Sequence, residues 1–133
     1  YFGKHYCRSE IASTVIQTSV VERVETFKLL GVIFSSDLTW NAHVGHIVSK
    51  SSKRIFAICQ LIRSGIPVAD VICVYCSLIR SVLKYASPVW HSGLTKTQSD
   101  EIERVQKRCM KIVFPQLNYG DALETCGFRT AEY

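Results

Sequence analysis

The sequence PVADVICVYCSLIRSVL occupies residues 67–83 and decides the fold class of this chain. Its apolar side chains recur every three to four residues, as they do along one face of an α-helix. Pro67 stands where a proline is tolerated best, in the first turn of a new helix. Cysteines and further valines widen the apolar face until little polar surface remains. The pattern therefore predicts a central helix that is mostly buried.

A second helical pattern precedes this one and ends at Gly65. Thr39 or Asn41 could cap its start, because side chains of both types accept hydrogen bonds from the free N–H groups of a first turn. Its apolar positions fall on one face, centred on Val44 and Ile47. The other face carries a basic stripe, made of His43, His46, Lys50, Lys53 and Arg54.

A third helical pattern follows and is stopped by Pro115. It opens at Thr95 or Thr97, and Thr97 with Asp100 approximates a capping box. A last short helix is expected over residues 119–126, before Gly127. The polar face of the third helix is again basic and contains Arg104, Lys107, Arg108 and Lys111.

The first 35 residues have a different character, because they are rich in valine, isoleucine, threonine and phenylalanine. Residues 12–18 and 27–34 are typical of strands. We therefore expect a mainly α chain of the α+β class. Residues 1–36 would form an N-terminal β-hairpin remnant, and residues 37–133 a bundle of three to four helices.

The charge of the chain is concentrated in its middle. The composition, with 47% hydrophobic and 20% charged residues, is that of a folded globular protein, and the formal net charge is +5. Residues 50–111 contain eleven Lys or Arg against four acidic residues, a local net charge of +7. Such a field favours nucleic acid or another anionic surface as partner. A solvated basic face without a partner is the alternative.

Six cysteines raise the question of a disulfide framework, but no secretory signal core and no Asn-x-Ser/Thr acceptor accompanies them. We therefore expect reduced thiols and an intracellular location, in the nucleus or the cytoplasm. The longest apolar stretch is far shorter than the roughly 20 residues of a membrane helix, so no membrane partner is expected. The chain begins without Met, which suggests a fragment of a longer protein.

The sequence contains no complete redox, metal-binding or catalytic motif. Cys73 and Cys76 lie inside a helix rather than at its start, which favours core packing over a redox or metal role. His43 and His46 lack a third ligand, so a solvated or phosphate-facing pair is expected. Trp90 could stack on a base or fill a helix junction, and we favour the junction. No catalytic residue, metal ligand or small-molecule substrate is predicted, and the isolated chain is not expected to be an enzyme.

Two longer strings, VETFKLLGV at residues 24–32 and DLTWNAHV at residues 37–44, resemble the region after the active site of non-LTR (LINE-type) retrotransposon reverse transcriptases. The resemblance continues through KR at 53–54, YC at 75–76, IRSVLKYA at 79–86, PVWH at 88–91 and IERVQKR at 102–108. It covers roughly residues 20–133. It implies a primer-grip hairpin at the palm edge in residues 1–36 and a thumb-like helical domain in residues 37–133.

By this resemblance Phe27, Leu30 and Gly31 belong to the primer-grip element. The parent would be an RNA-directed DNA polymerase that uses Mg²⁺, but no Asp-Asp pair occurs in this sequence, so no cofactor is expected in the chain itself. Template-primer binding, to RNA or DNA, would be the function that remains. The expected contacts with the nucleic-acid backbone are Lys50, Lys53, Arg54, Arg104, Lys107, Arg108 and Lys111.

Two other interpretations stay open. The chain could be a non-catalytic protein-interaction module, or an orphan structural module derived from a decayed element. A domain like the N-terminal region of AlkB homologue eight, a repair dioxygenase and methyltransferase, is a third interpretation. Neither an iron-binding triad nor a Gly-rich cofactor loop is visible in the sequence to support it. The oligomeric state is not predicted.

Overall fold

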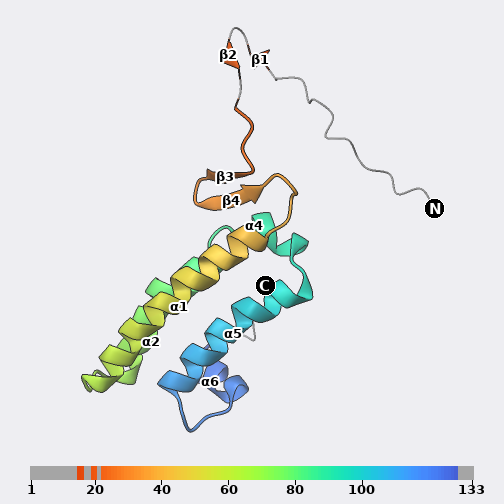
Figure 1. Cartoon of the computed structure of the whole chain (residues 1–133). Coiled ribbons are helices and arrows are strands. Elements are labelled where there is room, and N and C mark those ends of the chain that lie inside the picture. The colour runs from red at the N-terminus through yellow and green to blue at the C-terminus, as the bar shows by residue number, and fades with distance from the viewer. Residues whose placement is uncertain (1–14, 17–18, 21, 129–133) are drawn as a thin grey trace, which may run out of the picture.

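A computed structural model describes residues 15–16, 19–20 and 22–128 (Figure 1). The chain is mainly α-helical, with short antiparallel β-hairpins before a bundle of helices. The predicted fold class is therefore confirmed. Within the described residues, no helix combines the length and the apolar character that crossing a membrane requires.

Two strand pairs precede the helices. β1 (Val15–Ile16) pairs with β2 (Ser19–Val20), and β3 (Thr26–Leu29) pairs with β4 (Val32–Ser35), both in antiparallel fashion. The expected single strand over residues 27–34 is therefore wrong, because these residues form two strands joined by a turn. Of the expected strand over residues 12–18, only the two residues of β1 fall within the part that the structure describes.

The turn between β3 and β4 consists of Leu30 and Gly31, which have φ values of 47° and 84°. Positive φ at both central positions is the requirement of a type I′ turn, whose twist matches that of the flanking strands. Glycine adopts this conformation without the steric cost that a β-carbon brings. The local sequence therefore folds the run back on itself instead of extending it.

The helix α1 (Asn41–Arg63) is the centre of the bundle. On one side it packs against a helix that runs through α2 (Val68–Tyr75), the π-helix η1 (Cys76–Arg80) and α3 (Ser81–Lys84). On another side it packs against α5 (Lys96–Val113), and at its N-terminal end against β4 (Figure 1).

Short elements complete the chain. α4 (Ser87–Trp90) and the 3₁₀ turn η2 (His91–Gly93) connect α3 to α5. α6 (Tyr119–Thr125) packs against α5 (Figure 1), and Gly127, with a φ of 68°, ends it as the sequence predicted.

The predicted burial of the residue 67–83 helix is only partly right. Its fully buried positions are spaced by four residues, at Val71, Tyr75, Ile79 and Leu83. Val68, Leu78 and Cys73 are exposed, so the predicted core position of Cys73 is wrong. The reason is that this helix packs on the surface of α1 through one narrow stripe, whereas α1 takes the central place.

The predicted caps also need correction. The α5 capping box is made by Thr95 and Gln98, because Thr95 Oγ1 accepts from the Gln98 N–H over 3.3 Å and Gln98 Oε1 from the Thr95 N–H over 2.9 Å. Neither residue expected to cap α1 does so, since its N-cap is Trp40. Thr39 bonds the Asp37 carboxylate instead, and Asn41 Oδ1 accepts from Gln98 Nε2 over 2.6 Å.

Candidate nucleic-acid interface

The β3–β4 hairpin presents the three residues that the resemblance assigns to a primer grip. The side chains of Phe27 and Leu30 are 56% and 82% exposed, and Gly31 occupies the turn. The Tyr85 hydroxyl donates a hydrogen bond of 2.8 Å to the Leu30 carbonyl oxygen, which ties the tip to the chain after α3. A β-carbon at Gly31 would lie 3.2 Å from Cε1 of Tyr85, so the turn approaches this ring closely.

The prediction that His43 belongs to an exposed basic stripe is wrong. His43 is 1% exposed, and its ring lies against those of Trp90 and Trp40, with centroids 5.4 Å and 6.1 Å away. The Ile33 N–H donates to its Nδ1 over 3.3 Å, so His43 joins the hairpin to α1. Burial, followed by the nearby His46, lowers the pKa of His43 and favours the neutral ring.

A hollow of about 320 Å³ opens between the hairpin, the first turns of α1, and α3. Lys28 of β3 lies on its hairpin side, and His46 and Lys50 lie on its α1 side. Their side chains are exposed, so the ammonium groups of Lys28 and Lys50 meet solvent at the edges of the hollow. The residues that line it are Lys28, Gly31, His43, His46, Ile47, Lys50, Ser81, Val82 and Tyr85.

A second, shallower hollow continues along α1 and shares His46 and Lys50 with the first. Lys53, Arg54 and Ser49 complete its lining. We call the two hollows together the basic trough. Among the described residues that line it, none is acidic. A continuous row of cations without compensating carboxylates attracts anions and suits a phosphate backbone.

Arg54 has a structural role as well as a place in the trough. Its Nη1 donates a hydrogen bond of 2.6 Å to the Leu78 carbonyl oxygen in η1. A π-helix departs from the regular i−4 ladder, and such single turns are frequent at functional sites. The guanidinium therefore holds α1 and η1 together, and only its remaining N–H groups are available to an anion.

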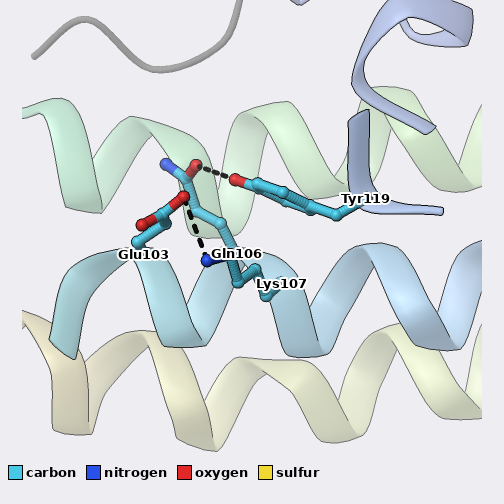
Figure 2. Close-up of polar contacts among 4 residues, drawn as sticks. All are labelled: Glu103, Gln106, Lys107 and Tyr119. Carbon is cyan, nitrogen blue, oxygen red and sulfur yellow. Dashed lines mark hydrogen bonds and ion pairs between the residues drawn. The ribbon is translucent and has the colours of Figure 1, made fainter. Parts of the chain in front are cut away.

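The basic residues of α5 form a separate surface. Arg104, Lys107, Arg108 and Lys111 are all exposed on its outer side, and no residue of α5 lines either hollow of the trough. Lys107 forms an ion pair with Glu103, with Nζ 3.3 Å from Oε1, and its Nζ lies 5.4 Å from the Tyr119 ring centroid (Figure 2). The Tyr119 hydroxyl in turn donates to Gln106 Oε1 over 3.3 Å.

The seven predicted backbone contacts are thus divided between two places. The structure brings together Lys50, Lys53 and Arg54 along α1, and Lys50 also lines the hollow that the predicted primer-grip turn borders at Gly31. Lys28 and Tyr85, which also line this hollow, were not among the predicted site residues. The alternation of β3 could have placed Lys28 on one face of the hairpin, but no sequence signal links that face to α1.

The described part of the chain contains no group of three His, Cys, Asp or Glu side chains that could hold a metal ion. Comparisons of the chain with protein-family models, with curated proteins and with solved structures found no match.

Proposed function

We propose that the chain binds the sugar-phosphate backbone of an RNA–DNA template-primer through the basic trough, as the hairpin-and-thumb part of a reverse transcriptase. The observation that carries the proposal is that Lys28 from the hairpin and Lys50 from α1 line one hollow, and that Lys50 also lines the adjoining hollow together with Lys53. The turn that resembles a primer grip borders this hollow through Gly31.

The expected mode of binding follows from the kinds of side chain involved. Lysine ammonium groups contact phosphates as point charges and read no base sequence. Each phosphate contact releases condensed counterions, so affinity falls steeply as the salt concentration rises. On a duplex, each contact adds roughly −0.9 to the slope of log affinity against log salt concentration. The proposal includes binding alone and no catalytic step, because the sequence contains no Asp-Asp pair.

The test compares two variants with the same change of charge. One carries Lys28→Glu, Lys50→Glu and Lys53→Glu in the trough, and the other carries Arg104→Glu, Arg108→Glu and Lys111→Glu on α5. Both leave buried positions untouched, because all six residues are exposed. Binding of a fluorescent RNA–DNA hybrid is measured across a salt series from about 50 to 200 mM, a range in which such contacts change affinity strongly.

We expect the trough variant to lose both affinity and salt dependence. The α5 variant should lose only the general attraction between a basic protein and nucleic acid. Its affinity should therefore fall less, and the slope of log affinity against log salt should stay close to that of the wild type. Equal losses in the two variants would mean that binding follows net charge rather than the trough. Weak binding by the wild type that does not respond to salt would exclude the proposal.

A protein-interaction module is the second candidate. It is favoured by the outer strand of the hairpin, where every residue of β3 is exposed, including the apolar Phe27 and Leu29. Exposed edge strands with apolar side chains readily add a further strand from a partner. In that case Leu29→Ser, which lies outside the predicted primer-grip residues, would weaken partner binding and leave hybrid binding unchanged.

A further inference from the structure

The Phe128 side chain, shortly after α6, lies against the helix formed by α2 and η1. The Phe128 ring lies against the Tyr75 ring, with the centroids 6.0 Å apart, and the Arg80 guanidinium carbon lies 3.9 Å from the Phe128 ring centroid. Phe128 therefore contacts this helix on both sides of Cys76, which directly follows Tyr75 and lies one turn before Arg80. Because Cys126 lies two residues before Phe128, these contacts bring the C-terminal end of α6 to the part of the helix that contains Cys76.

The backbone around Cys126 is fixed by the end of α6. The Gly127 N–H donates to the Glu124 carbonyl over 2.9 Å, and the Phe128 N–H donates to the Leu123 carbonyl over 2.8 Å. Together with the positive φ of Gly127, these two bonds form a Schellman motif. The backbone of Cys126 thus has one defined conformation at the end of α6.

We propose that Cys76 and Cys126 are a site of reversible oxidation, at which a disulfide joins the C-terminal end of α6 to the π-helix η1. Both thiols are partly exposed and pack at the edge of the same core, so a small oxidant can reach them. Within the described residues they do not belong to any set of three metal-binding side chains, which favours a two-thiol reaction over a metal site.

The electrostatics agree with this placement. Burial raises the pKa of Cys126, the neighbouring Cys76 raises it further, and Arg80 lowers it. The pKa of Cys126 is raised overall, and Arg80 offsets part of the rise by stabilising the Cys126 thiolate. Cys109 differs, since it is fully buried and its burial raises its pKa to about 12, which leaves it unreactive.

The chemistry needs a peroxide as oxidant. One thiolate attacks hydrogen peroxide to give a sulfenic acid and hydroxide, which takes up the proton that the thiol released to form water. The second thiol then attacks the sulfenic sulfur, so the S–S bond forms, the S–O bond breaks, and a second water leaves. Each chain loses two hydrogen atoms, and a dithiol such as dithiothreitol reverses the change by exchange.

The test treats the full chain, at micromolar concentration, with hydrogen peroxide and then digests it with trypsin under non-reducing conditions. Cys126 falls in the peptide of residues 112–129 and Cys76 in that of residues 64–80, which also contains Cys73. We expect these two peptides to be joined in the wild type and in Cys73→Ser, and released by dithiothreitol. The joined species should be absent from Cys76→Ser, and free-thiol titration should show a loss of two thiols per chain.

Three results would overturn the inference. One is a bond from Cys126 to Cys73 or to any other cysteine. Another is a joined species that appears only in covalent dimers on a non-reducing gel. The last is a Cys126 that stays reduced, or goes on to sulfinic acid without pairing. Fragment-ion spectra of the wild-type peptide identify the bonded cysteine directly, so the result does not depend on how well a variant folds.

Discussion

The backbone N–H of Ile33 donates a hydrogen bond to Nδ1 of His43 over 3.3 Å, and this bond joins the β3–β4 hairpin to α1. Only the neutral imidazole can accept it, because the imidazolium carries a proton on both ring nitrogens. The other nitrogen, Nε2, is buried and has no hydrogen-bond partner within the described residues. The docking of the hairpin therefore depends on a neutral His43.

Stability should consequently decrease in mild acid. The pKa of His43 is lowered in the folded chain from its ordinary value of 6.5, so the unfolded chain binds more protons. Its contribution to stability is complete above pH 6.5 and is lost as the pH falls through the lower, folded value. We expect urea midpoints to decrease between pH 7.5 and pH 5.

The control for this prediction uses the neighbouring histidine. His43→Gln removes the titrating ring, so its stability should vary less over the same pH range, whereas the exposed His46→Gln should keep most of the wild-type decrease. If both variants show the same pH dependence as the wild type, His43 does not control the docking.

Two glycines give substitutions of opposite sign. Gly31→Ala places a β-carbon at a φ of 84° and 3.2 Å from Tyr85 Cε1, so it should lower the free energy of unfolding by about 1–2 kcal/mol. Gly45→Ala in α1 meets no atom within 4 Å and should raise it by about 0.5–1 kcal/mol. Urea denaturation of the two variants measures both, and a stabilising Gly31→Ala would contradict the turn geometry.

Helical periodicity correctly predicts which residues are buried in the interior of the bundle, but it does not predict burial at the edges of a helix face. Val44, Ile47, Ile55 and Ile58 are buried as their spacing predicts, because the face they share is wide. His43 lies at the margin between the apolar and the basic face. Whether such a residue is covered depends on what packs there, and here the hairpin and Trp90 cover it. A single helix does not contain that information.

The trough could be predicted only in part, for a similar reason. The stripe of Lys50 and Lys53 follows from α1 alone, but Lys28 joins it only because the hairpin folds back over α1. The π-helix η1 was also not predicted, because its residues fit an ordinary helical pattern. Arg54 of α1 donates a hydrogen bond to the Leu78 carbonyl oxygen in this turn, and the pattern of a single helix does not contain such a contact.

Alanine variants of Arg54 and Lys53 test how much the hydrogen bond from Arg54 to η1 contributes to stability. Arg54→Ala removes the donor to the Leu78 carbonyl oxygen and should lower the free energy of unfolding by about 1 kcal/mol. Lys53→Ala removes the same charge from an exposed position and should change it by less than about 0.5 kcal/mol. Chemical denaturation distinguishes them, and equal effects would show that the Arg54 bond contributes nothing to stability.

Trp90 allows packing to be distinguished from base stacking. Its side chain is fully buried, and Nε1 donates to the Tyr85 carbonyl oxygen over 2.9 Å, so it fills the junction between α1 and the chain that follows α3. Trp90→Phe should lower the free energy of unfolding by about 1–3 kcal/mol, through lost volume and an unsatisfied carbonyl. Hybrid binding, measured where the variant remains folded, should keep the wild-type affinity and salt slope.

The exposed Phe56→Ala serves as control and should change stability by less than about 0.5 kcal/mol. A loss of binding by about 1–3 kcal/mol in folded Trp90→Phe would instead indicate that the indole stacks on a base, which requires it to leave the core.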